Sequence, residues 1–309
     1  MSNKKIAVLI GCSAEYEVSL MTASGVTAAL DEKGYSHITA DIDAYLPSIL
    51  LQERPDAVFI ASHGGNAEDG RVQGLLDILG VPYVGSGVLA SSLAMSKHKA
   101  KLIFQQMGLR TPEFSVVSGD AYGKEQLDME FELMKHGGVV VKPEKQGSSI
   151  GISMVTQVED LQRAIEDAFA FDSLVMIERM IRGVELSVPV LGDKELTVLP
   201  CIEIAPKNTY YDYEAKYTPG MSDHLIPPRV EQCIIEEAQS MAIAAHRALG
   251  CRDLSRSDFM VDEHGCWLLE VNTLPGMTPT SLVPDAARAL GWSYADLIDK
   301  LIRMALDRA

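Results

Sequence analysis

The chain has 309 residues, enough for two or three domains, and its 47% hydrophobic and 23% charged residues are typical of a globular protein. No apolar run approaches the length of a membrane-spanning helix, and the N-terminus lacks the features of a signal peptide, so we expect a cytoplasmic protein. A net charge of −16 argues against nucleic acids and anionic membranes as partners. Five cysteines without CxxC spacing argue against a zinc site or a disulfide framework.

Alternating strand and helix patterns run through the first ninety or so residues. Apolar residues 6–10 predict a strand, a helical stripe spans Val18 to Leu30 with Gly34 able to end the helix, and residues 57–61 predict another strand. Such alternation is typical of a parallel, Rossmann-like unit, in which ligands bind beyond the carboxyl ends of the strands.

Two side chains fall near those strand ends. Glu15 is a candidate partner for a substrate ammonium, but a helix cap is an equally good interpretation from the residues alone. His63 lies between an apolar run and two glycines and is a candidate substrate contact, although a lone histidine is more often structural.

A second unit is expected from about residue 96. Residues 97–107 predict a helix, and residues 139–143 and 152–155 predict strands on both sides of a glycine- and serine-rich loop. Because a P-loop leads into a helix, this loop is not one. We interpret it as a flap whose backbone N–H groups approach phosphate oxygens, with Lys142 at its base, and a plain flexible hairpin is the alternative.

A further strand, residues 174–177, ends at Glu178, and Glu185 follows shortly after it. Carboxylates in such positions accept hydrogen bonds from ribose hydroxyls, and the apolar Met180 and Ile181 between them are candidates to line an adenine slot. Exposed surface charge is the alternative, and the residues alone favour it.

The last unit, from about residue 183, combines strands and helices. Residues 186–190 and 196–204 predict strands, residues 234–249 predict a helix with a packed stripe, and residues 297–304 lie in a final helix. Four tyrosines within residues 210–217 indicate an ordered loop that can act as a lid, with a sticky surface loop as the alternative.

The most informative segment is a predicted β-hairpin around Gly265, whose glycine can adopt the positive φ that a three-residue loop needs. A register that pairs Asp262 with Cys266 brings four polar side chains onto one face. These are Asp258 opposite Glu270 and Arg256 opposite Asn272. Their oxygens suit Mg²⁺ that also holds nucleotide phosphates, and the arginine can clamp a phosphate or an oxyanion. The exposed face of an ordinary hairpin is the alternative.

Taken in order, these motifs resemble the D-alanine–D-alanine ligase family of the ATP-grasp superfamily, essentially from end to end. The tyrosine-rich segment and the last matching segment are the most specific. The matching segments are residues 13–20, 63–74, 82–87, 142–149, 211–217, 256–258 and 268–284.

The resemblance implies an α/β protein with α+β subdomains, namely an ATP-grasp fold with an N-terminal Rossmann-like unit. Its expected parts are an N-terminal Rossmann-like substrate domain (1–95), a central ATP-grasp subdomain (96–182) and a C-terminal ATP-grasp subdomain with the metal site and the lid loop (183–309). The partners that it implies are D-alanine, ATP and Mg²⁺ (two ions, with Mn²⁺ as a substitute), and a second copy in a homodimer.

The implied reaction has two steps and makes D-alanyl-D-alanine for peptidoglycan precursors. The carboxylate of a first D-alanine attacks the γ-phosphate of ATP to give an acyl phosphate. The amine of a second D-alanine then attacks that carbonyl, and phosphate leaves. Glu15 would bind the first ammonium, Arg256 and the Gly276 backbone N–H would stabilise the oxyanion, and Ser281 would receive the second carboxylate.

The resemblance also implies a set of site residues. Those that would hold ATP are Lys97, Lys142, Ser148, Ser149, Glu178, Met180, Ile181, Glu185 and Lys216. Those that would bind Mg²⁺ are Asp258, Glu270 and Asn272. The catalytic residues would be Glu15, Ser148, Tyr217, Arg256, Gly276 and Ser281. The substrates would contact Glu15, His63, Arg256, Ser281 and Leu282.

Two alternatives to this function stay open. The second substrate could be D-lactate or D-serine, although Tyr217 in the lid points to D-alanine. The chain could instead be a non-catalytic nucleotide-binding regulator, against which the intact hairpin motif argues. The chain departs from the family pattern beside the first-substrate site, at Cys12, Tyr16 and Ala67.

Overall fold

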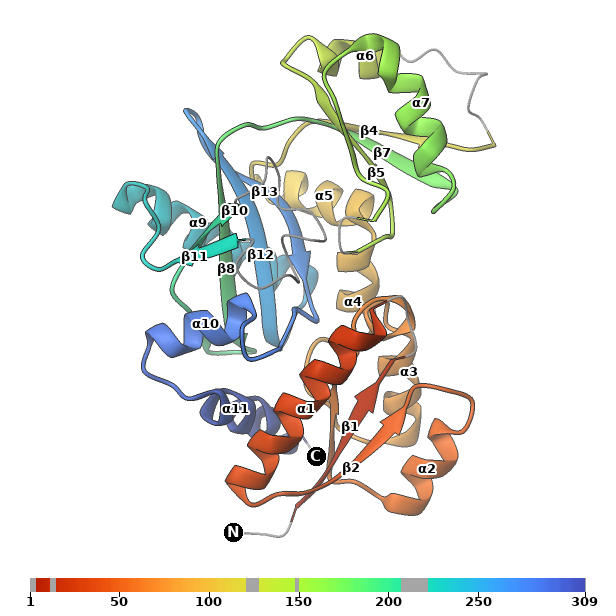
Figure 1. Ribbon diagram of the computed structural model, residues 1–309, viewed down its shortest axis with the longest axis vertical. Coiled ribbons are helices and arrows are strands. Elements are labelled where there is room, and N and C mark those ends of the chain that lie inside the picture. Colours follow the sequence, from red (N-terminus) through yellow and green to blue (C-terminus); the bar gives the residue numbers. More distant parts are fainter. Residues whose placement is uncertain (1–3, 12–14, 121–127, 148–149, 207–221, 309) are drawn as a thin grey trace.

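Three sheets, each with its own helices, are stacked along the long axis of the computed structural model (Figure 1). The structure describes residues 4–11, 15–120, 128–147, 150–206 and 222–308. The sheet of the first residues lies at one end, that of the middle residues lies at the other, and the sheet of the last residues lies between them. None of the described helices is both long and apolar enough to cross a membrane.

The first sheet is parallel, with the strand order β2–β1–β3, and confirms the predicted strand–helix alternation. Helix α1 ends as expected at Gly34, which adopts a φ of 77°. The elements are β1 (Lys5–Ile10), α1 (Tyr16–Lys33), β2 (Ser36–Asp41), α2 (Leu46–Glu53), β3 (Ala57–Ile60), the short 3-10 helix η1 (Gly65–Ala67) and α3 (Arg71–Leu79).

The side chains of β1 alternate between two hydrophobic clusters. Ile6 and Val8 pack with α1 and with the C-terminal helix α11 (Tyr294–Leu306), whereas Ala7 and Leu9 face α2 and α3. The first sheet is therefore covered on both faces, as parallel sheets are, and one of its covering helices comes from the end of the chain.

The second sheet is antiparallel, in the order β4–β7–β5–β6. The two strands predicted around the glycine- and serine-rich loop are β5 and β6, which pair directly. Val139 and Val141 pack toward α7, so Lys142 and Glu178 alternate to the opposite face. The elements are β4 (Phe114–Ser118), α6 (Asp128–Met134), β5 (Val139–Pro143), β6 (Ser153–Val155), α7 (Val158–Ala168) and β7 (Leu174–Arg179).

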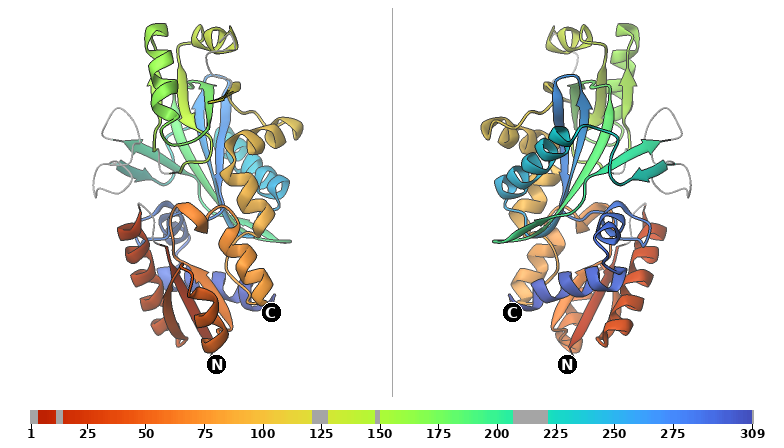
Figure 2. Two further views of the ribbon diagram at one scale, coloured as in Figure 1. Left: turned by 90° about the vertical axis from the view of Figure 1, so that its right-hand side faces the viewer. Right: turned by 90° about the vertical axis from the view of Figure 1, so that its left-hand side faces the viewer.

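The third sheet is antiparallel, in the order β11–β10–β8–β12–β13, with β9 paired to β8. The two views of Figure 2 show β10 and β11 projecting to one side of this sheet. Its elements are β8 (Val184–Gly192), β9 (Leu196–Val198), β10 (Ile202–Pro206), β11 (Ser222–Leu225), α9 (Gln232–Leu249), β12 (Asp253–Asp262) and β13 (Gly265–Asn272).

The single strand predicted over residues 196–204 is wrong, because the structure divides it into β9 and β10. Pro200 lies between them and has no N–H to donate, which interrupts the ladder along β8.

Helices α4 (Val88–Met95) and α5 (Lys97–Gln106) join α9 on one face of the third sheet. Ala100 and Phe104 of α5 lie in one buried cluster with Phe259 and Leu268 of the hairpin. The opposite face of the hairpin is left for polar side chains. Helix α10 (Leu282–Ala289) then leads the chain back to the first sheet.

The predicted hairpin register is correct for the pairs Asp258–Glu270 and Arg256–Asn272 but wrong at the turn. Asp262 pairs with Gly265, not with Cys266, and Gly265 has a φ of 108°. A bulge at Leu269 adds one residue to β13, so that Asp258 nevertheless lies opposite Glu270. The shorter turn and the bulge compensate, and the predicted polar face forms.

Candidate active site

The hairpin face predicted from the sequence is built around the buried carboxylate of Asp258. Its oxygens accept hydrogen bonds from Arg256 (Nε at 2.9 Å, Nη2 at 2.7 Å), Ser187 Oγ (2.7 Å) and Asn272 Nδ2 (2.9 Å). Because the amide nitrogen of Asn272 is turned to Asp258, its carbonyl oxygen remains available to bind a cation.

Glu270 connects this face to helix α5. Its Oε2 atom lies 3.8 Å from Lys97 Nζ, and the same ammonium donates to the Gln146 carbonyl at 2.6 Å. Burial lowers the pKa of Lys97, while the negative charge of Glu270 opposes that shift. A pocket opens at this junction, and residues that line it include Glu68, Lys97, Gly147, Glu270 and Asn272.

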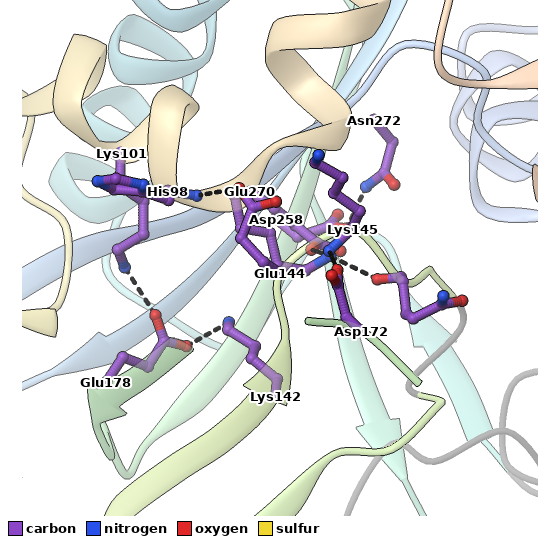
Figure 3. A network of polar contacts seen from close by, with 12 residues as sticks. His98, Lys101, Lys142, Glu144, Lys145, Asp172, Glu178, Asp258, Glu270 and Asn272 are labelled. Carbon is purple, nitrogen blue, oxygen red and sulfur yellow. Dashed lines mark hydrogen bonds and ion pairs between the residues drawn. The ribbon is translucent and has the colours of Figure 1, made fainter. Parts of the chain in front are cut away.

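Figure 3 shows a second buried ionic group, to which α5 contributes Lys101, one helical turn after Lys97. The carboxylate of Glu178 is shared between two ammonium groups: Lys101 Nζ donates to Oε2 at 2.7 Å, and Lys142 Nζ donates to Oε1. The surface-charge interpretation of Glu178 is therefore wrong, because its side chain is only 4% exposed. Burial alone would raise the pKa of Glu178, but the charges of Lys101 and Lys142 outweigh it and lower that pKa.

The base of the glycine- and serine-rich loop is fixed to the start of α5. Glu144 Oε1 accepts hydrogen bonds from the Ser96 hydroxyl and from the His98 backbone N–H (3.2 Å), so this carboxylate caps the helix from a distant segment. On the other side, the Lys145 backbone N–H donates to Asp172 at 2.8 Å. These bonds hold Lys97 and Lys142 at fixed positions relative to each other.

Glu15 and His63 lie at the carboxyl end of the first sheet, as predicted. Glu15 occupies the N-cap position of α1, but its side chain makes no capping hydrogen bond and is buried, so the capping interpretation is wrong. His63 Nε2 lies 2.9 Å from Thr22 Oγ1, and the His63 backbone N–H donates to Ser19 Oγ. Burial lowers the pKa of His63 to about 4, so its ring is neutral at pH 7.

Gly276, Ser281 and Leu282 gather at the start of α10. Ser281 is the N-cap residue of that helix, and its hydroxyl lies 2.7 Å from Thr278 Oγ1 and accepts from the Thr278 N–H at 3.0 Å. A Cβ atom on Gly276 would lie 3.1 Å from Ser281 Oγ, so the glycine backbone and the serine hydroxyl are neighbours. Leu282 is buried.

Met180, Ile181 and Glu185 lie after β7 and at the start of β8. Met180 and Ile181 line a cavity that also includes Arg179, Arg182 and the hairpin turn. Glu185 pairs in register with Met260 of β12 and is partly exposed. Four predicted site residues lie outside the described residues: Ser148, Ser149, Lys216 and Tyr217.

Three residues near this site were not assigned a role from the sequence: Glu68, Lys101 and Ser187. Glu68 lines the pocket beside Lys97, accepts from the Gly64 N–H at 2.9 Å, and has its pKa raised by burial to about 7. Lys101 follows Lys97 by one helical turn, a spacing that could have placed it on the same face. Ser187 had no comparable signal.

The candidate metal ligands include an amide as well as carboxylates. Within the ranges that the structure describes, no three His, Cys, Asp or Glu side chains come together as a metal-binding group. The candidate set of Asp258, Glu270 and Asn272 has two carboxylates and one amide. That composition suits a hard cation that keeps water and phosphate oxygens among its ligands.

Comparison with known proteins identifies the family. A family model described as D-ala D-ala ligase C-terminus matches residues 103–303, and one described as D-ala D-ala ligase N-terminus matches residues 47–86. A D-alanine–D-alanine ligase of Desulforudis audaxviator is 47% identical over 308 residues (99% of both chains), and one of Pelotomaculum thermopropionicum is 46% identical (98% of this chain, 97% of the relative).

Solved structures agree with the sequence relatives. A Bacillus anthracis D-alanine–D-alanine ligase complexed with ATP has a TM-score of 0.84 at 32% identity and covers 99% of this chain and 98% of its own. The VanG D-Ala:D-Ser ligase of Enterococcus faecalis has a TM-score of 0.84 at 31% identity, and the match covers 98% of this chain and 100% of that ligase. The expectation of an ATP-grasp fold with an N-terminal Rossmann-like unit is confirmed, and the chain is a ligase that belongs to the D-alanine–D-alanine ligase family.

Proposed function

We propose that this chain joins two D-alanine molecules into D-alanyl-D-alanine at the expense of ATP, for use in peptidoglycan precursors. The observation that carries the proposal is the position of the Lys97 ammonium. Lys97 lines one pocket with Glu270 and Asn272 of the hairpin face, and it interacts electrostatically with the buried pair of Lys142 and Glu178. Cations beside paired carboxylates suit a bound triphosphate and its metal.

In this proposal the nucleotide lies between the second and third sheets. The ammonium groups of Lys97 and Lys142 contact its phosphates, while Glu178 and Glu185 accept hydrogen bonds from the nucleoside. Met180 and Ile181 offer apolar contacts to the base, since they line a cavity at this junction. On the resemblance alone, Ser148, Ser149 and Lys216 also contact ATP.

The residues present fit Mg²⁺. Asp258 and Glu270 supply carboxylate oxygens, and the orientation of Asn272 leaves its carbonyl oxygen free to coordinate. When bound, the ions (two, with Mn²⁺ as a substitute) neutralise charge on the transferring phosphate. Ser187 and Arg256 hold the Asp258 carboxylate in place, which pre-orients this set.

The first step forms a bond between a carboxylate oxygen of D-alanine and the γ-phosphorus of ATP, and ADP leaves. Glu15, buried at the start of α1, pairs with the ammonium of this first substrate. His63 lies next to that position as a neutral ring, which lets it accept or donate one hydrogen bond without adding charge.

In the second step the free amine of another D-alanine attacks the acyl carbonyl and expels phosphate. Arg256 and the Gly276 N–H stabilise the negative oxygen that develops on that carbonyl. Ser281, at the positive N-terminal end of α10, receives the carboxylate of the second substrate, beside Leu282. Ser148 and Tyr217 are proposed, from the resemblance, to link the flap and the lid to Glu15.

The proposal extends to organisation and location. We propose domains at residues 1–95, 96–182 and 183–309, a homodimer and a cytoplasmic location, all of which follow from the sequence and the resemblance. Because one structural neighbour is named as a D-Ala:D-Ser ligase, D-serine is the second candidate for the attacking amine.

The test is phosphate release from ATP by the purified chain with and without D-alanine. We expect release to depend on D-alanine and on Mg²⁺, with D-alanyl-D-alanine as the product by mass. D-serine added in competition measures the alternative, and L-alanine is the control. Release that does not respond to D-alanine would reject the proposed reaction, and nucleotide binding without release would favour a regulator.

A further inference from the structure

Lys101 is the most deeply buried charged side chain of the nucleotide region that the structure describes. Its side chain is 0% exposed, and its neighbours on α5, Ala100 and Phe104, belong to the hydrophobic cluster of the third sheet. Its Nζ atom lies 5.3 Å from the centre of the Phe114 ring. An ammonium in such surroundings is costly to bury unless it has an anionic partner, and Glu178 Oε2 at 2.7 Å is that partner.

The three side chains of this ionic group differ in their exposure to solvent. Lys142 and Glu178 keep 7% and 4% side-chain exposure, whereas Lys101 keeps none. Lys142 is at the end of β5, next to the loop that we propose contacts phosphate, while Lys101 approaches Glu178 from helix α5. A ligand in the site can therefore reach Lys142 and Glu178 but not Lys101.

The cluster of Lys101, Lys142 and Glu178 has two cations for one anion, so it carries one excess positive charge. A nucleotide phosphate supplies the missing anion when Lys142 turns toward it. Without Lys101, that movement would leave Glu178 as an uncompensated buried carboxylate. The Glu178 carboxylate would then tend either to retain its contact with Lys142 or to take up a proton.

We propose that Lys101 is a positioning residue of the nucleotide site: it holds Glu178 as an oriented carboxylate and thereby releases Lys142 to bind phosphate. The proposal rests on the proposed function, since it assigns a task within the ATP site. Phe114 pairs in register with Glu178 across β4 and β7, and its ring faces the Lys101 ammonium, so it adds a second favourable contact for that cation.

The experiment compares Lys101→Met, which keeps length and removes charge, with wild type in ATP binding by calorimetry and in steady-state kinetics. We expect the Kd and KM for ATP to rise at least tenfold, while KM for D-alanine changes less than threefold. Arg308→Leu is the matched control for loss of a buried ion pair, because Arg308 pairs with the buried Asp253 away from the nucleotide region. Its KM for ATP should not change.

A double-mutant cycle separates positioning from general damage. A Glu178→Gln background lacks the carboxylate that Lys101 is proposed to hold. Adding Lys101→Met in that background should therefore change ATP affinity less than threefold. If the two losses multiply in the double variant, or if Lys101→Met binds ATP within threefold of wild type, the inference is overturned. Lys101→Gln, which keeps a hydrogen-bond donor, replaces the methionine variant if that variant does not fold, with the same criteria. Wild type that fails to bind ATP would instead reject the proposed function.

Discussion

Replacing Glu270 by Gln tests the proposed metal site with the smallest change in shape. The substitution removes one of two carboxylate charges on the hairpin face and leaves the Asp258 hydrogen bonds untouched. The Lys97–Glu270 contact is long, at 3.8 Å, and Glu270 is 32% exposed. Losing it should cost at most about 1 kcal/mol of folding free energy, or about 2 °C in melting temperature.

Catalysis should respond far more strongly than stability. Weaker neutralisation of the transferring phosphate should cost about 3–5 kcal/mol of transition-state stabilisation. Because each 1.36 kcal/mol corresponds to about a factor of ten, turnover should fall by roughly 10²- to 10⁴-fold. The assay is ADP release coupled to a reporter, with Mg²⁺ titrated from low to high concentration and melting measured in parallel.

A carboxylate of matched exposure outside the site provides the control. Asp56 is 33% exposed, close to the 32% of Glu270, and accepts hydrogen bonds from Lys4 Nζ and the Lys5 N–H at 2.8 Å each. It lines neither cavity of the site, so Asp56→Asn should keep turnover near wild type. Turnover of Glu270→Gln within threefold of wild type at ordinary Mg²⁺ would refute the assignment of Glu270.

Three further outcomes are expected. Arg308→Leu leaves the buried Asp253 carboxylate without its cation, which should cost about 3 kcal/mol and lower the melting temperature by about 5 °C; an unchanged melt would contradict this. The folded pKa of His63, about 4, is below its unfolded value of 6.5. The unfolded state therefore binds more protons between these pH values, and about 3 kcal/mol of stability is lost on acidification. His63→Gln should reduce that loss in denaturant titrations at pH 7 and pH 4.5, and an identical pH dependence would exclude His63 as its source. Tyr217→Phe should gain D-alanyl-D-lactate synthesis in competition with D-alanine, measured by mass across pH, and an unchanged product ratio would remove Tyr217 from the specificity argument.

The polar hairpin face could be predicted from the sequence because strand side chains alternate and because four metal- or phosphate-binding residue types recur at that period. Its turn could not. Counting residues from Gly265 cannot distinguish a three-residue loop from a shorter turn followed by a bulge, since both place Asp258 opposite Glu270. Local sequence contains no signal that makes Leu269 the bulged residue.

Residues whose role depends on distant partners were the ones that sequence reasoning missed. A lysine on a helix usually extends into solvent, and only tertiary packing brings Lys101 to Glu178, 77 positions away. The same holds for Ser187, which contacts Asp258 from a neighbouring strand. The carboxylate of Glu144 likewise caps a helix that starts 47 positions earlier in the chain, at Lys97, so no local capping pattern predicts it.

Helix α11 covers the face of the first sheet from which Ile6 and Val8 project, although almost three hundred residues separate it from β1. During synthesis the N-terminal strands leave the ribosome long before the helix that covers them. Until residues 294–306 have been translated, part of the apolar surface of that sheet has no native partner. A nascent or prematurely terminated chain would therefore expose it to chaperones, and C-terminal truncation should impair folding of the N-terminal segment as well.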